Sequence, residues 1–198
     1  PACGGAESRC DRGGTVRICA GSINQGKGHE TTCTQVVADK LGVHPDDIEY
    51  IQGDTDKVFF GEGTGGSRSA TMSGSAFYMA GEKVIAKAKA IAAHNMKVDV
   101  ADIKFEEGIF SSAKTNQTTT IKDVAQDSFN PAKLPKNMEA GLYATAVYQA
   151  EDDKFPHAVT GRVIEVDPYA GKACGGTTNW RTCRRTVSRQ RLHRGLIW

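Results

Sequence analysis

The sequence of 198 residues lacks several patterns that would assign it at once to a class of protein. No apolar run approaches the roughly 20 residues needed to span a bilayer. The first ten residues contain no apolar stretch of the kind found in secretion signals. We therefore expect no membrane span and a cytoplasmic location. The six cysteines form no C-x-x-C pair and no regular zinc spacing, so we expect free thiols in a reducing compartment.

Acidic residues are absent from segment 171–198, whereas residues 1–170 are net acidic, so the overall charge of +2 describes neither part. We divide the chain into an atypical N-terminal segment at 1–13, a body at 14–172 and a basic tail at 173–198. Three interpretations of the tail are open: a disordered end, an arginine-rich arm that binds RNA, or out-of-frame sequence. We expect no nucleic-acid partner. The basic residues of 171–198 are Lys172, Arg181, Arg184, Arg185, Arg189, Arg191 and Arg194.

Hydrophobic periodicity predicts the secondary structure of the body. We expect a strand at 15–20, a helix at 30–42 that ends at Gly42, a strand at 48–52 and a long helix at 69–94. Further on we expect two strands within 98–112 joined by a turn at 107–108, a helix from Thr120 to Ser128, and paired strands at 141–150 and 157–167. This order lacks the regular strand–helix alternation of a doubly wound sheet. It therefore predicts an α+β fold with mixed sheets and helices.

The stretch GSINQGKGHETT, residues 21–32, matches the P-loop pattern G-x-x-x-x-G-K-[ST] at every position but the last. A P-loop needs Ser or Thr directly after its Lys, because that hydroxyl binds Mg²⁺. Here Gly28 follows Lys27, and the surrounding chain lacks the parallel sheet of a nucleotide triphosphatase. The adjacent His29 and Glu30 resemble a metal-binding or acid–base pair, but no third ligand has suitable spacing. We therefore predict no metal ligands in this chain.

The stretch GEGTGG, residues 61–66, satisfies the G-x-G-x-x-G pattern of dinucleotide-binding folds. Its context contradicts that assignment, because a polar segment precedes it and a helix lies where the acidic strand end should be. Both stretches nevertheless share one design, a glycine-rich loop that leads into a helix, and helix N-termini favour anions. Two such loops suit one large anionic ligand contacted at two places. The alternative is that the glycines only make tight turns.

The motifs together carry a resemblance to a known family. Q-G-x-G-H-E-T-T, V-A-D-x-L-G-V, D-D-I, G-D-T-D and G-x-G-T-x-G-S-R-S follow one another within 25–69. In order and spacing the chain resembles, from Gly14 to Lys172, the molybdenum-cofactor subunit of the xanthine oxidase family. The similarity is strongest to the large subunits of aerobic carbon monoxide dehydrogenases. The body is then part of a molybdopterin-binding domain, and the tail resembles nothing in the family.

The resemblance implies an oxidoreductase that hydroxylates a small-molecule substrate, or oxidises CO, with oxygen from water. The cofactor is a molybdopterin cytosine dinucleotide that carries molybdenum. The implied partners are an iron–sulfur small subunit, a medium subunit that binds FAD, and the remainder of the large subunit. The substrate stays open among CO, purines, aldehydes and N-heterocycles. The implied cofactor-binding residues are Gln25, Gly26, Lys27, Gly28, His29, Glu30, Thr31, Thr64, Gly65, Gly66, Ser67, Arg68 and Ser69.

Two departures of the chain from the family bear on the cofactor site and on catalysis. Lys27 stands where relatives have a glutamine that contacts the molybdenum end of the cofactor, and a lysine offers no amide acceptor. The family's catalytic glutamate belongs to a region near the C-terminus of a much longer chain, and no Glu of this sequence matches it. We therefore assign no catalytic residue. Two other interpretations stay open, a non-catalytic nucleotide- or pterin-binding module and an inert truncated product.

Overall fold

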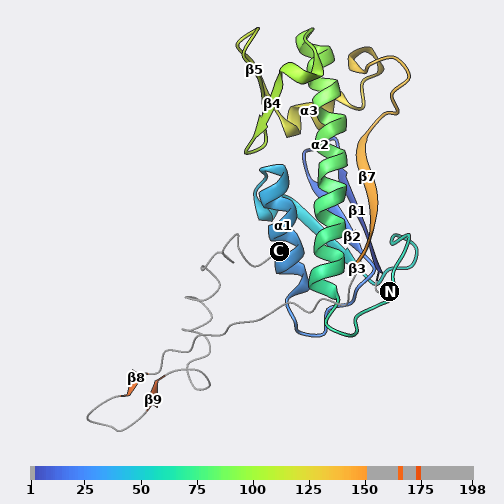
Figure 1. The fold of residues 1–198 in the computed structure, drawn as a ribbon, viewed down its shortest axis with the longest axis vertical. Coiled ribbons are helices and arrows are strands. Elements are labelled where there is room, and N and C mark those ends of the chain that lie inside the picture. The colour runs from blue at the N-terminus through green and yellow to red at the C-terminus, as the bar shows by residue number, and fades with distance from the viewer. Residues whose placement is uncertain (1–2, 151–164, 167–172, 175–198) are drawn as a thin grey trace. The chain divides into compact units, whose positions relative to one another are not determined.

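A computed structural model of the chain describes residues 3–150, 165–166 and 173–174. The chain divides into two units, residues 1–155 and 156–198. In the second unit the described residues form a short antiparallel ladder between β8 (Glu165–Val166) and β9 (Ala173–Cys174). All other described elements belong to the first unit, and Figure 1 shows their arrangement.

A four-stranded sheet in the order β3-β2-β1-β7 forms the base of the first unit. Its strands are β1 (Cys3–Cys10), β2 (Val16–Ala20), β3 (Ile48–Gln52) and β7 (Leu142–Gln149). β1 pairs antiparallel with both β2 and β7, whereas β2 and β3 are parallel and are joined through a helix. A single parallel pair in an otherwise antiparallel sheet agrees with the predicted α+β class.

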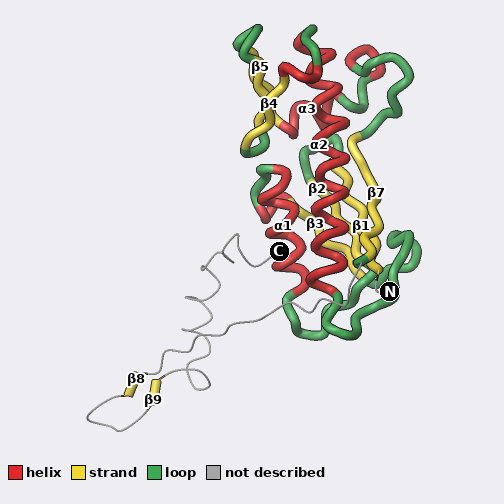
Figure 2. Tube along the Cα trace, in the orientation of Figure 1, coloured by secondary structure: helices red, strands yellow, loops and turns green. Residues whose placement is uncertain are grey.

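Two helices cover one face of this sheet (Figure 2). α1 (His29–Leu41) packs against α2 (Gly74–Met96), and α2 also packs along β1 and β7. Four alanines of α2, at positions 76, 80, 88 and 92, are fully buried. Phe77 is fully buried near its start. The fully buried hydrophobic residues of α2 include Ala76, Phe77, Ala80, Val84, Ala88, Ile91 and Ala92.

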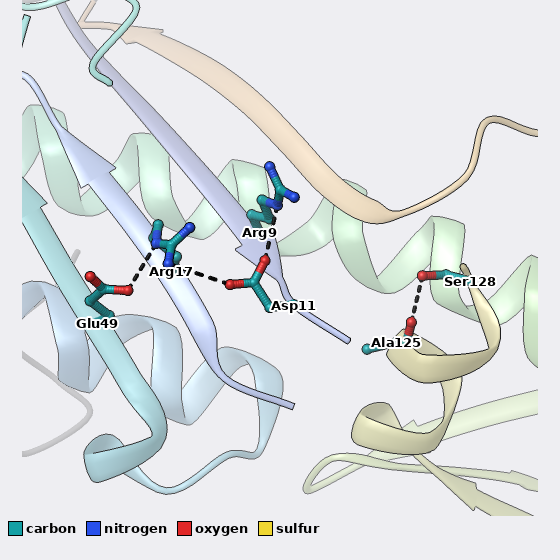
Figure 3. Close-up of polar contacts among 6 residues, drawn as sticks. All are labelled: Arg9, Asp11, Arg17, Glu49, Ala125 and Ser128. Atoms are coloured by element: carbon teal, nitrogen blue, oxygen red, sulfur yellow. Dashed lines mark hydrogen bonds and ion pairs between the residues drawn. The ribbon is translucent and has the colours of Figure 1, made fainter. Parts of the chain in front are cut away.

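The opposite face of the sheet carries a row of charged side chains. Arg9, Arg17 and Glu49 lie in one cross-strand row on β1, β2 and β3. Arg17 Nε lies 2.8 Å from Glu49 Oε2, and Asp11 pairs with Arg9 at 3.0 Å and with Arg17 at 3.6 Å (Figure 3). Exposed ion pairs of this kind stabilise a fold little. They mark a face on which this row is solvated rather than packed.

A three-stranded antiparallel sheet follows α2, with β4 (Ile103–Glu106), β5 (Ile109–Ser112) and β6 (Gln117–Thr120) in that order. The rings of Phe105 and Phe110 pack with centroids 4.6 Å apart. β6 leads directly into α3 (Ile121–Asp127), whose N-terminus is fixed by a capping box between Thr120 and Asp123. Short helical turns complete the unit at Pro45–Asp47, Val100–Asp102 and Pro131–Lys133, and a π-helical turn occupies Ser69–Ser73.

Most predicted elements of the body are confirmed within one or two residues, including the C-terminal Gly42 of α1 and the Thr120 cap of α3. The predicted helix at 69–94 begins with the π-helical turn, and its α-helical part is α2. Sequence analysis assigned no element to segment 1–13, yet β1 lies at the centre of the sheet. The predicted strand at 141–150 is β7, which pairs with β1. Its expected partner at 157–167 lies outside the described residues except for 165–166, and so does most of the tail.

Candidate functional site

The first glycine loop, residues 21–28, connects β2 to α1 and is held by Asn24. The side-chain oxygen of Asn24 accepts hydrogen bonds from the backbone N–H groups of Lys27, at 2.8 Å, and Gly28, at 3.2 Å. The backbone N–H of Asn24 donates to Gln52 Oε1 at 2.8 Å. The amides of Lys27 and Gly28 are therefore used within the loop itself. This arrangement differs from a P-loop, whose amides point at the ligand.

The three backbone amides that follow Gly28 belong to the first turn of α1 and not to the loop. Gly28 is the N-cap of α1 and has a left-handed backbone with φ 74°. The backbone N–H of Thr32 donates to the carbonyl oxygen of Gly28 at 3.1 Å. The N–H groups of His29, Glu30 and Thr31 precede this bond and so have no acceptor inside the helix. They form the positive end of the α1 dipole, which favours an acceptor or an anion.

His29 is the buried residue of this helix start, with 7% of its surface exposed. Its Nδ1 atom is buried and has no hydrogen-bond partner among the described residues. Burial lowers the pKa of His29 below its usual value, and the nearby charge of Lys27 lowers it further. A hydrogen bond with the backbone of Ile23 raises the pKa of His29 and so opposes these two effects. A neutral imidazole with one unused nitrogen therefore lies where the first loop meets the helix.

The other predicted residues of the first loop are exposed. Gln25, Gly26, Lys27, Glu30 and Thr31 all face solvent. The Lys27 ammonium donates to Gln25 Oε1 at 3.0 Å, so these two side chains form a local pair at the loop tip.

The second glycine loop, residues 61–69, is hydrogen-bonded directly to the first. The Ile23 N–H donates to Thr64 Oγ1 at 2.9 Å, and the Thr64 hydroxyl donates to the Ile23 carbonyl oxygen at 2.5 Å. The Gly63 N–H donates to the carbonyl oxygen of Gly21 at 3.1 Å. The structure thus joins the two loops that sequence analysis treated as parts of one site.

A close contact between two glycines reinforces this junction. A Cβ atom on Gly21 would lie 2.2 Å from the Cα of Gly61, and one on Gly61 would lie 2.3 Å from the Cα of Gly21. No side chain fits at either position without moving backbone. These two glycines are therefore needed for the contact between the loops.

The guanidinium of Arg68 is hydrogen-bonded within its own loop. Its guanidinium donates to the Glu62 carboxylate at 2.7 Å, to the Glu62 carbonyl oxygen at 2.5 Å and to the Gly63 carbonyl oxygen at 3.3 Å. In this conformation Arg68 braces its own loop. The preceding Ser67 has a left-handed backbone with φ 54°, a strained conformation for a residue with a side chain.

Gly65 and Gly66 are exposed, and Ser69 is buried with its hydroxyl 3.4 Å from Thr64 Oγ1. Sequence analysis missed the residues behind them. A pocket between the loops is also lined by Gly4 and Gly5 of β1, and by Ser22 and Ser73, whose hydroxyls lie 3.3 Å apart. The available signal was the glycine pair inside a strand, which marks a close approach of another backbone.

Side chains that could ligate a metal do not gather in the described part of the chain. No group of three or more His, Cys, Asp or Glu side chains that could hold a metal lies within the described residues. Cys10, Cys19 and Cys33 are buried free thiols, and burial raises the pKa of Cys33 to about 12. In the described part of the chain, no helix is long and apolar enough to cross a bilayer.

Comparison with known proteins bears on this pair of loops. The chain is 36% identical over 169 residues to the carbon monoxide dehydrogenase large chain of Afipia carboxidovorans, covering 85% of this chain and 21% of the relative. It is 33% identical over 168 residues to the 6-hydroxypseudooxynicotine dehydrogenase complex subunit gamma of Paenarthrobacter nicotinovorans, covering 85% of this chain and 21% of that protein. The chain thus spans about a fifth of the length of these relatives.

The fold agrees with the sequence comparison. The crystal structure of a Cu,Mo-CO dehydrogenase in its carbon monoxide reduced state superposes with a TM-score of 0.71 at 37% identity, over 75% of this chain and 19% of that one. Residues 1–174 match the family described as the molybdopterin cofactor-binding domain, a match that includes β1 and both glycine loops. The chain therefore belongs to the molybdopterin cofactor-binding domain family of the xanthine oxidase-type molybdenum enzymes.

Proposed function

We propose that the two glycine loops form part of the binding surface for a molybdopterin cytosine dinucleotide. The contact between them carries the proposal, because the Ile23–Thr64 hydrogen bonds and the Gly21–Gly61 contact hold two anion-compatible loops as one surface. One large cofactor can contact both loops at once. A single phosphate does not require such a junction.

The residues present fit such a group. The start of α1 offers backbone amides that have no acceptor within the helix. A Cβ atom at Gly26, Gly28, Gly65 or Gly66 would meet no atom within 4 Å, so the backbone is open to a ligand at these positions. Lys27 and the hydroxyls of Thr31 and Ser67 add exposed donors. Arg68 acts indirectly, by fixing the loop through Glu62 and Gly63.

The whole protein is proposed to be a molybdenum hydroxylase or a CO-oxidising enzyme. When bound, molybdenum in such a cofactor supplies oxygen transfer and accepts electrons. The residues of this chain bind and orient the cofactor, and the catalytic base comes from the remainder of the large subunit. An iron–sulfur subunit and a subunit that binds FAD are the proposed partners, in a cytoplasmic complex. The substrate is a small molecule.

Cofactor analysis of the purified protein tests this proposal. The protein containing residues 1–198 is produced in a host that makes molybdopterin cytosine dinucleotide. Bound pterin is then measured by fluorescence, and released cytidine nucleotide and molybdenum by mass spectrometry. We expect all three in equal amounts. Folded protein without pterin contradicts the proposal, and pterin without cytidine nucleotide contradicts the dinucleotide form.

A pair of matched variants locates the binding surface. Thr64→Val removes the hydroxyl that joins the loops, and Thr118→Val makes the same change on the exposed side of β6. We expect the first variant to lose pterin and the second to keep it. Equal retention in the two variants indicates that the cofactor binds elsewhere. In a non-catalytic pterin-binding module, Thr64→Val would also lose pterin and Thr118→Val would also keep it. Oxidoreductase activity of the assembled complex distinguishes an enzyme from such a module.

A further inference from the structure

β7 is an edge strand of the four-stranded sheet in the described part of the chain. It runs for eight residues, LYATAVYQ, without a charged residue, a proline or a glycine. Edge strands commonly carry charges or proline, which discourage pairing with another chain. The edge strands β3 and β4 do carry charges, Glu49 on β3 and Lys104 and Glu106 on β4, and β6 is uncharged but only four residues long. β7 therefore has the composition of a strand that pairs readily on both sides.

The side chains on the outer side of β7 are also suited to pairing. Leu142 and Ala146 are buried on the side where α2 packs, whereas Tyr143 and Val147 are 45% and 49% exposed. Thr145 is exposed between them. An aromatic ring opposite a β-branched side chain is a favourable cross-strand pair in an antiparallel sheet. The exposed side of β7 offers one residue of each kind.

Two lysines of α2 occupy the edge of β7, which runs alongside this helix (Figure 1). Lys83 Nζ donates to the carbonyl oxygen of Thr145 at 2.8 Å, and Lys87 Nζ lies 5.1 Å from the centre of the Tyr143 ring. Because α2 packs on the buried side of β7, Lys87 passes the edge of the strand to reach a ring on the exposed side. A strand without charges of its own thus has two positive charges held at its edge by the neighbouring helix.

We propose that the edge of β7 is a strand-pairing surface for a second copy of this chain, and that Lys83 and Lys87 keep it from pairing. An antiparallel pair centred on Thr145 places Tyr143 of each copy opposite Val147 of the other, so the surface is complementary to itself. The lysines oppose this pairing in two ways. Lys83 occupies a backbone acceptor of the strand, and pairing would bring two ammonium groups from each copy to one junction.

Removal of both lysines tests the proposal. The protein containing residues 1–198 is purified as wild type, as Lys83→Ala/Lys87→Ala and as Lys89→Ala/Lys136→Ala. The last variant loses the same charge, at a position on another side of α2 and at one in the loop before β7. Sedimentation velocity over a range of concentrations measures self-association. We expect the dissociation constant of the dimer to fall at least about tenfold in the first variant and to keep its wild-type value in the second.

A further substitution tests whether the dimer forms through β7. Val147→Lys, added to the alanine pair, places a charge opposite Tyr143 of the second copy and should restore the wild-type dissociation constant. Thr118→Lys adds the same charge at an exposed position of β6 and should leave the dimer intact. A dimer that survives Val147→Lys forms through another surface and contradicts the proposal.

A second pair of substitutions separates pairing from loss of fold. Lys83→Met/Lys87→Met keeps the length of both side chains but removes the charges and the donors, and it should dimerise like the alanine pair. Thermal unfolding shows which variants are folded. The proposal is wrong if the folded methionine variant self-associates no more than the wild type, or if the wild type already pairs equally well. The readout does not involve pterin, so failure of this inference and failure of the proposed function are distinguishable.

Discussion

The two ends of α1 are both marked by a left-handed glycine, Gly28 with φ 74° at the start and Gly42 with φ 64° at the end. The surroundings of these glycines differ. A Cβ atom on Gly42 would lie 2.0 Å from the backbone nitrogen of Gly108, in the turn between β4 and β5. A Cβ atom on Gly28 would meet nothing within 4 Å. The fold itself fills the space at one end of the helix and leaves it open at the other.

This difference shows which glycines serve folding and which are available to a ligand. At the end of α1, glycine permits two backbones to touch, as it also does between Gly21 and Gly61. At the start of α1, open backbone at Gly28 precedes helix amides that have no acceptor within the helix, and Gly65 and Gly66 of the second loop are open as well. Sequence spacing alone does not separate these two classes, because both look like turn glycines.

The largest expected effect is on folding, at the closed end of α1. Gly108→Ala forces a side chain onto a backbone with φ 81° and places Cβ 2.4 Å from the Gly42 carbonyl oxygen. We expect a loss of about 3 kcal/mol in the free energy of unfolding, from strain and overpacking together. Urea denaturation measures it. A loss below about 1 kcal/mol would show that the two backbones separate easily, and the comparison between the helix ends would fail.

The next effect is at the junction of the loops. Thr64→Val removes both hydrogen bonds to Ile23 and should lower the free energy of unfolding by about 2 kcal/mol. Thr64→Ser keeps the hydroxyl and should restore most of that loss. Urea denaturation of the two variants without cofactor gives the comparison. Equal stability of Val and Ser variants would mean that the hydroxyl does not hold the loops together.

Sequence analysis predicted the elements of this region because α1, β2, β3 and the caps depend on local patterns. It also identified both loops, from their motifs. It missed β1, because CGGAESRC has two glycines and charged residues where a central strand usually has apolar ones. Only the pairing with β2 and β7, which is non-local, makes this segment a strand. The pairing of Arg68 with Glu62 is likewise a tertiary detail that the motif conceals.

Gly65 lies in open space, in contrast to Gly108, so a substitution there tests ligand binding rather than folding. Its backbone is not left-handed, and a Cβ atom there would meet nothing within 4 Å. Gly65→Ala should therefore change the free energy of unfolding by no more than about 0.5 kcal/mol. The added methyl group lies where a ligand would approach the backbone, so bound pterin should fall about tenfold. Fluorescence of the extracted pterin measures this. A variant that keeps its pterin would remove Gly65 from the binding surface.

The smallest expected effect concerns pH and the open end of α1. The pKa of His29 is lowered in the folded protein, chiefly by burial, so the unfolded chain binds a proton there more readily than the folded one. The stability that a neutral His29 contributes is present above the unfolded pKa, near 6.5, and is lost as the pH falls below it.

His29→Asn has no titrating group, so its unfolding free energy should decrease less between pH 7.5 and pH 5.5 than that of the wild type. Denaturation at several pH values in this range gives both curves, and His94→Asn, at an exposed position, should follow the wild type. Parallel curves for wild type and His29→Asn would show that the imidazole protonates freely in the folded protein. The start of α1 would then be as accessible to water as the loop tip.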